Sequence, residues 1–160
     1  MHANDLLTTL AQLGVALAGF SGVVVALGAR ARGEWSPRER GLLRVLLERS
    51  GAVVLWSLLP LLLLAAELTE RRVWFLSSTS WVIVQGAYLV RGVRLVVKNP
   101  SIRRERTFLI PSFVGTVAVL AMQITNLFWL RVAWPHLAAI MWHLALSFVV
   151  FVQLLQQEEA

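Results

Sequence analysis

The chain has 160 residues, of which 58% are hydrophobic and 15% charged, and it contains no cysteine. Soluble domains usually have about 45–50% apolar and about 25% charged residues, and a chain this small needs much polar surface to remain dissolved. The composition therefore excludes an ordinary soluble globule. The lack of cysteine excludes disulfides, thiolate metal sites and iron–sulfur clusters.

Five apolar stretches are each long enough to cross a bilayer, which takes about 20 residues of helix. With their polar extensions, the predicted helices cover residues 6–28, 37–68, 73–98, 107–130 and 136–156. The remaining residues form short connections and tails, with no room for a soluble domain. We therefore predict one all-α membrane domain over residues 1–160, built as a bundle of five transmembrane helices.

Small residues recur every four positions along the first predicted helix, at Gly14, Ala18, Gly22 and Ala26. Lipid provides no hydrophobic drive for helix association, so close approach of backbones at small residues supplies much of the packing energy. Two interpretations stay open. The four residues form either a seam between copies of the chain or the face of a central helix packed against its own neighbours.

The start of the second predicted helix carries two local patterns. Ser36, Pro37 and Glu39 form a capping box, with proline at the first helical position. Arg44 and Glu48 are four residues apart and are predicted to pair on one face of the helix.

The basic residues indicate the orientation in the membrane, because cytoplasmic loops collect lysine and arginine. Twelve lie around the connections between predicted helices one and two and between helices three and four, and three lie on the opposite side, at Arg71, Arg72 and Arg131. We predict an outer amino terminus and a cytoplasmic carboxy terminus. The domainless layout further favours a bacterial cytoplasmic (inner) membrane. Trp74, Trp129 and Trp134 are expected at the outer interface.

The basic cluster after the third predicted helix has a predicted partner. It contains Arg91, Arg94, Lys98, Arg103, Arg104 and Arg106. Basic residues near the surface attract anionic lipid headgroups, at about 1 kcal/mol each, so we expect this cluster to contact such headgroups. Nucleic acid is not an expected partner, because orientation in the membrane accounts for the charge.

A few polar residues interrupt the apolar spans. The predicted polar cluster contains Gln12, Gln123, Asn126, His143 and Ser147. Helical depth places the first four near one level, and Ser147 shares one face of the fifth predicted helix with His136 and His143, as a polar stripe. Such residues often serve only as interhelical glue, worth about 0.6 kcal/mol per contact, whereas an ionisable group in the bilayer marks a functional site by default. Both interpretations stay open, and His143 is the titratable member of the cluster.

Several chemistries are disfavoured. His136 and His143 lie two turns apart on one helix, which does not suit a haem held by two facing histidines, and the predicted spans offer no carboxylate to complete a metal site. Nor does any carboxylate lie at a spacing from a histidine and a hydroxyl that suggests nucleophilic catalysis. We expect no metal, no cofactor and no enzymatic activity.

Two functions are compatible with these features. One is a homo-oligomeric channel or transport-type protein with a polar site between predicted helices one, four and five. The other is a non-catalytic accessory or scaffold subunit of a larger membrane complex, which would copurify with a membrane-protein partner.

Overall fold

The computed structural model describes residues 3–27, 36–98 and 106–156, of which 95% are helical and none lies in a strand. The elements are α1 (Ala3–Leu27), α2 (Pro37–Ala65), α3 (Glu70–Lys98), α4 (Arg106–Thr125), a π-helical turn η3 (Asn126–Leu130) and α5 (Ala133–Gln156). Within these ranges, five helices are long and apolar enough to span a membrane, with η3 extending α4. The prediction of an all-helical chain with five such helices is confirmed.

The predicted start of α2 is confirmed in detail. The Ser36 amide donates to Glu39 Oε2 at 2.8 Å, and the Glu39 amide donates to Ser36 Oγ at 3.2 Å. This reciprocal pair satisfies two amides that have no partner within the helix. One turn further on, Arg44 Nε donates to Glu48 Oε1 at 2.7 Å, as the spacing predicts.

Several helix ends differ from the predicted ones. α2 ends at Ala65 and α3 starts at Glu70, so the connection between them lies three residues earlier than predicted, with the same length. Glu67 lies in it with a left-handed φ of 58°. α5 starts at Ala133, before Pro135, because the first turn of a helix needs no amide donor at that position. The predicted turn over residues 131–135 is therefore only two residues long.

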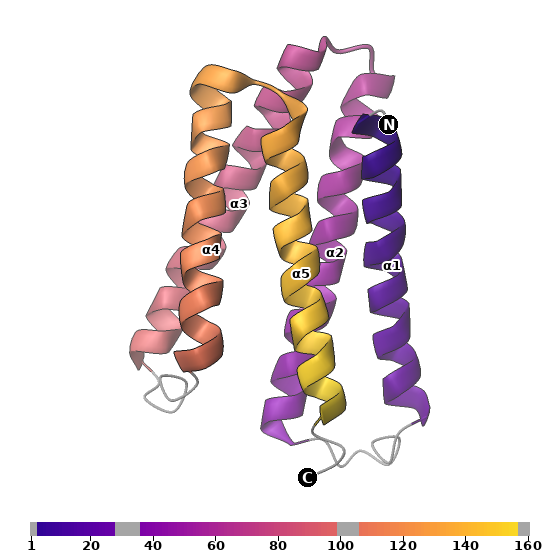
Figure 1. Cartoon of the computed structure of the whole chain (residues 1–160), viewed down its shortest axis with the longest axis vertical. Helices are drawn as coiled ribbons and strands as arrows, with labels where there is room; N and C mark the ends of the chain where they lie inside the picture. The colour runs from indigo at the N-terminus through magenta and orange to yellow at the C-terminus, as the bar shows by residue number, and fades with distance from the viewer. Residues whose placement is uncertain (1–2, 28–35, 99–105, 157–160) are drawn as a thin grey trace. The chain divides into compact units, whose positions relative to one another are not determined.

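The chain divides into two compact units. The first contains Met1–Leu61 and His143–Ala160, and the second contains Leu62–Trp142. The first unit therefore holds α1, most of α2 and the second half of α5, and the second unit holds α3, α4, η3 and the start of α5 (Figure 1). In the second unit, the α2–α3 connection and the η3–α5 connection lie at the same end (Figure 1).

In the first unit, α1 packs through one face with helical spacing. Leu7, Leu10, Gly14 and Ser21 are buried on that face. A Cβ atom at Gly14 would lie 3.0 Å from the backbone oxygen of Ser50 and 3.0 Å from side-chain carbons of Val53 and Val54. Glycine at this position therefore lets the backbone of α1 approach α2 closely.

In the second unit, α3 supplies the buried face. Its buried residues follow the helical repeat, at Val73, Trp74, Ser77, Ser78, Trp81 and Gln85. Trp81 is fully buried. Two tryptophans and three polar side chains therefore point into this unit rather than outward.

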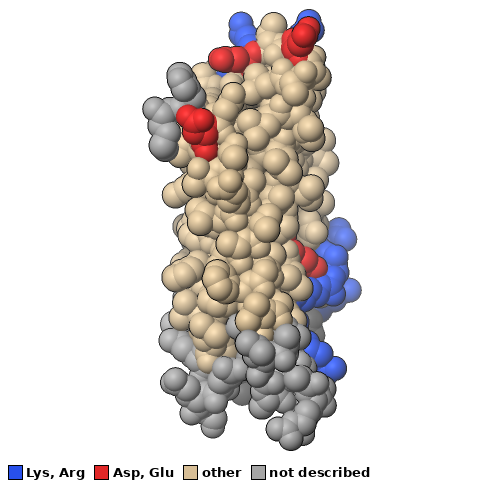
Figure 2. All heavy atoms as spheres, turned by 90° about the vertical axis from the view of Figure 1, so that its right-hand side faces the viewer, with Lys and Arg blue, Asp and Glu red and all other residues tan. Residues whose placement is uncertain are grey.

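The outer surface of the helices is strongly apolar. Leu55, Leu62 and Ile83 each expose about two thirds of their area, at 69%, 67% and 66%. The face that includes α1 is likewise largely uncharged (Figure 2). Large exposed apolar surfaces are rare in soluble monomers and are expected where lipid replaces water. The structure thus has the surface of a multi-pass membrane protein.

Candidate functional site

A contact between a half-buried arginine and a buried histidine is the most unusual feature of the first unit. Arg49 Nη1 of α2 lies 3.1 Å from His143 Nδ1 of α5, and the histidine is only 1% exposed. Both residues belong to stretches apolar enough to span a membrane, Glu39–Ala65 and Ala133–Leu155. Ionisable residues inside such spans are rare and mark functional sites by default.

The direction of this hydrogen bond fixes the form of the imidazole. A guanidinium group can only donate, so Nδ1 of His143 must accept and the ring carries its proton on Nε2. A doubly protonated ring could not accept this bond, and it would place two cations in contact. The contact therefore depends on the protonation state of His143.

Buried hydroxyl groups extend the polar region along α2. Ser50 and Ser57 are fully buried, and in the described part of the chain their Oγ atoms have no hydrogen-bond partner. Together with Arg49 they lie on one helical face, over about 12 Å. Buried hydroxyls without partners are uncommon and often indicate ordered water, so this face is suited to hydration.

Ser147 forms its described hydrogen bond within its own helix. Its Oγ donates to the backbone oxygen of His143 at 2.9 Å, within α5 itself. The predicted polar stripe of α5 is buried, since His136, His143 and Ser147 are each at most 1% exposed. The serine hydroxyl stays on its own helix, where it holds the backbone of the turn that carries His143.

Asn126 connects three parts of the second unit. Its Nδ2 donates to Ser78 Oγ of α3 at 2.8 Å and to the Val132 oxygen at 3.1 Å, while its Oδ1 accepts from the Val132 amide at 3.0 Å. Its backbone oxygen accepts from the Arg131 amide at 2.9 Å, which closes the π-helical turn. Asn126 thus fixes the η3–α5 turn against α3.

Gln123 lies one turn before Asn126 and is fully buried. Its Nε2 donates to the backbone oxygen of Pro135 at 2.9 Å, and its Oε1 has no partner among the described residues. Gln123 thus bonds to the first turn of α5, whereas Asn126 bonds to Val132 in the η3–α5 turn. Gln123 and Asn126, both predicted members of the cluster, therefore lie together in the second unit. Their side chains link the end of α4 and η3 to α3, to the η3–α5 turn and to the start of α5.

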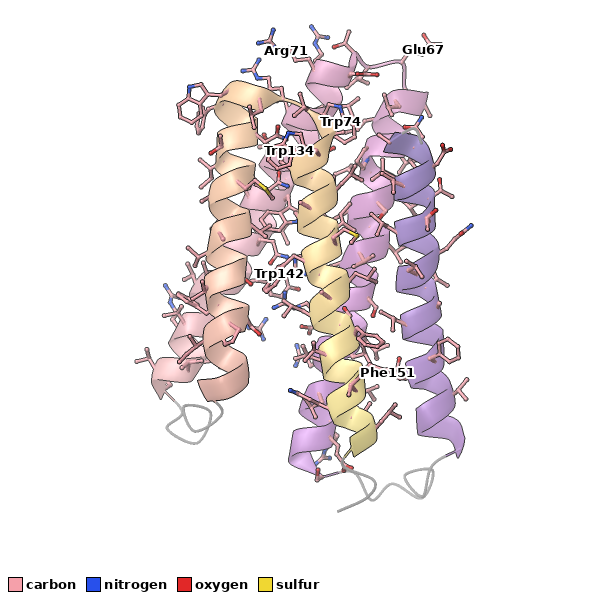
Figure 3. All side chains as sticks on the ribbon, in the orientation of Figure 1. Glu67, Arg71, Trp74, Trp134, Trp142 and Phe151 are labelled. Carbon is pink, nitrogen blue, oxygen red and sulfur yellow. The ribbon has the colours of Figure 1, made fainter. Side chains whose placement is uncertain are left out.

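Aromatic side chains fill the space around the same turn. The fully buried ring of His136 packs against Trp74 with ring centroids 6.1 Å apart. Trp142 lies further along α5 toward α4, where its Nε1 donates to Thr116 Oγ1 at 3.3 Å (Figure 3). Trp74 is only 5% exposed, which corrects its predicted place in an outer aromatic belt. Trp129 and Trp134 are 72% and 56% exposed, as such a belt requires.

Gln12 is not part of a buried cluster, because it lies on the exposed side of α1. The buried face of α1 runs through Leu10 and Gly14, and Gln12 points away from it at about 100° per residue. The predicted site between helices one, four and five stays a prediction, since α1 and α4 belong to different units. The described hydrogen-bond partners of the cluster come from α2, α3, the η3–α5 connection and the first turn of α5.

The small residues of α1 differ in how deeply they are buried. Gly14 packs against α2, Ala18 is half-buried, and Gly22 is exposed, with nothing within 4 Å of an added Cβ. The side chain of Ala26 lies outside the described residues. Gly14 thus supports packing within the chain, while Gly22 remains available for a contact between copies.

The basic cluster is described only in part. Arg91, Arg94 and Lys98 are exposed on the last turns of α3. They line a surface hollow of about 570 Å³. The predicted contacts of Arg103 and Arg104 and of the Arg106 side chain lie outside the described residues.

Sequence reasoning missed Arg49 and Ser78 as partners of the polar cluster. In the sequence, Arg49 is one of the twelve basic residues that indicate the orientation, and it lies near the start of an apolar stretch. A signal was present, because Arg49 shares a helical face with Leu46, Ser50 and Val53, all of which are buried. That face predicts an arginine turned toward the interior, although it does not predict which helix supplies its partner.

Among the described residues, no three histidine, cysteine or acidic side chains come together in a way that could hold a metal ion. No protein family, curated protein or solved structure shows a match to this chain. The function must therefore be argued from the site itself.

Proposed function

We propose that this chain is a transport-type protein of the cytoplasmic membrane and that the Arg49–His143 contact is its working site. The observation that carries the proposal is a hydrogen bond between a half-buried arginine and a buried histidine, within helices that are apolar enough to span the bilayer. Intramembrane histidines and arginines are typical of proton relays and of substrate or ion pathways.

The chemistry of the contact supports this assignment. Protonation of His143 removes the acceptor that Arg49 uses and brings two positive charges together. Their repulsion favours separation of α2 from α5 at this point. Deprotonation restores the bond. A contact with two such states can couple proton uptake to movement of α2 against α5, which is what gating or coupled transport requires.

The buried hydroxyls of Ser50 and Ser57 favour the same function. They extend the polar face of α2 beyond Arg49 and need water to complete their hydrogen bonds. Positive charge on the predicted cytoplasmic side further supports an outer amino terminus. We propose a homo-oligomer, with the exposed Gly22 face as the seam between copies.

Flux measurements in proteoliposomes test the proposal. Proton flux is read with a trapped pH-sensitive dye, and potassium and chloride fluxes are read in parallel across a range of pH. His143→Gln keeps a side-chain acceptor for Arg49 but cannot be protonated, so we expect normal assembly and loss of pH-dependent flux. Gln12→Ala, on the exposed face of α1, is the matched control and should behave as wild type.

A wild-type protein that gives no flux of any of these ions above empty liposomes would contradict the proposal. So would a His143→Gln protein with the full pH dependence of the wild type.

The accessory-subunit function remains a second candidate because one observation favours it. Every hydrogen-bonding atom of the Asn126 side chain is engaged within the chain, so that residue acts as structural glue. Purification in mild detergent followed by native mass measurement separates the two functions. Copies of this chain alone support the transport-type protein, and a stoichiometric second protein without flux supports the accessory subunit.

A further inference from the structure

A surface hollow on the last turns of α3 changes character along its length. The part nearer the middle of α3 is lined by Gly86, Ala87 and Val90, which are small or apolar, whereas Leu95 lies among the basic residues further along the helix. A Cβ atom at Gly86 would meet nothing within 4 Å. Because glycine has no side chain, the space beside the helix is open at this position. This part of the hollow is suited to a hydrocarbon chain.

The part of the hollow toward the end of α3 is basic. Arg91, Arg94 and Lys98 line it within two turns of helix, over about 10 Å, and all three are exposed. Among the described side chains of the second unit, they form the densest group of positive charge at that end of α3. Such a group is complementary to a phosphate-bearing headgroup.

The lining of the hollow changes from apolar to basic at Arg91, which is where a membrane surface is expected. Arg72 and Arg91 are 19 residues apart on α3, or about 28 Å along the helix, which matches a hydrocarbon core of about 30 Å. With Arg72 at one surface, Arg91 lies at the other. The apolar half of the hollow then lies within the hydrocarbon, and the basic half lies at the level of the headgroups.

We propose that this hollow binds one anionic phospholipid, with an acyl chain along Gly86, Ala87 and Val90 and the headgroup phosphate held by Arg91, Arg94 and Lys98. The volume of about 570 Å³ suits a headgroup with part of an acyl chain. This site is separate from the Arg49–His143 contact and does not depend on transport activity.

Native mass spectrometry of the detergent-purified protein tests the charge requirement. Phosphatidylglycerol and phosphatidylcholine with the same acyl chains are added in turn, and the bound fractions are compared. Each surface charge is worth about a fivefold change in binding, so R91Q/R94Q/K98Q should weaken phosphatidylglycerol binding by roughly tenfold or more, even with partial screening. R71Q/R72Q removes two equally exposed arginines from the opposite end of the same helix and should leave binding unchanged.

A second pair of variants tests the apolar part. Gly86→Leu adds an apolar side chain at a position that lines the hollow and has open space around its Cβ, and it should weaken binding of phosphatidylglycerol severalfold. Gly92→Leu is the matched control, because Gly92 also has open space around it but does not line the hollow. The Gly92→Leu protein should bind phosphatidylglycerol as the wild type does.

Three results would overturn the proposal. The first is equal retention of phosphatidylglycerol and phosphatidylcholine by the wild type. The second is unchanged phosphatidylglycerol binding in the R91Q/R94Q/K98Q protein. The third is displacement of the lipid by millimolar inorganic phosphate, because that outcome identifies a simple anion site rather than a lipid site.

Discussion

Asn126 and Arg49 are both polar residues in helices that could span a membrane, but their surroundings differ. The Asn126 side chain uses both of its amide donors and its oxygen within about one turn and one neighbouring helix. Arg49 instead contacts a ring whose hydrogen bonding depends on its protonation state. A saturated residue stabilises a single structure, whereas a residue with a titratable partner has two states available.

Replacing Asn126 with alanine should therefore destabilise the protein without changing any flux per folded molecule. The change removes the bond to Ser78 and the part-buried bonds to the Val132 amide and oxygen. We expect a loss of about 2 kcal/mol, measured as the free energy of unfolding in mixed micelles.

Thr125→Ala is the matched control for this prediction. Thr125 is exposed, and its hydroxyl bonds only to the Ala121 oxygen of its own helix, so the expected change is within about 0.5 kcal/mol. Equal stability of the Asn126→Ala protein and this control would contradict the role assigned to Asn126.

At the scale of the helices, two glycines set how closely neighbouring elements approach. Gly14 brings α1 against α2 in the first unit, and Gly115 lies directly beneath the indole of Trp142 in the second. A Cβ atom at Gly115 would overlap that indole ring. Glycine is needed at both positions because of the contact, not because of the backbone conformation.

Gly115→Ala should destabilise the second unit by about 1–3 kcal/mol, because the indole must move and its bond to Thr116 is strained or lost. Gly86→Ala, with open space around its Cβ, should instead stabilise helix α3 by about 0.5–1 kcal/mol through helix propensity. The measurement is again the free energy of unfolding in mixed micelles. A Gly115→Ala protein as stable as Gly86→Ala would show that the indole does not lie against α4.

Much of the helical framework follows from the sequence. The five apolar stretches, the capping box at Ser36 and the Arg44–Glu48 pair depend on residues near one another in the chain, and each is present in the structure. The buried stripe of His136, His143 and Ser147 also follows from helical periodicity.

The partners of the buried polar groups could not be predicted in the same way. Periodicity shows which residues share a face of one helix, but not which neighbouring helix faces them. For that reason the sequence alone grouped Gln12 with His143, whereas the structure places Arg49 there and turns Gln12 outward. The π-helical turn at Asn126 was missed because its cause is the side-chain bond to Val132, across a turn that no local pattern marks.

At the scale of the whole molecule, the missing cysteines make the proposed orientation directly testable. Single cysteines introduced at Thr69, in the α2–α3 connection, and at exposed Arg40, near the start of α2, have no background of native thiols. In intact cells, a membrane-impermeant maleimide should label the Thr69→Cys protein at once. The Arg40→Cys protein should react only after the membrane is permeabilised, and the reverse pattern would contradict an outer amino terminus.

The most direct test of the Arg49–His143 site is a double-mutant cycle on pH-dependent flux in proteoliposomes. Arg49→Gln, His143→Gln and the double variant are compared with the wild type, after each is shown to fold and assemble. If the two residues act through their 3.1 Å contact, each single change removes the pH dependence and the double variant is no more impaired than either one. Losses that multiply in the double variant, or single variants with wild-type pH dependence, would contradict a shared site.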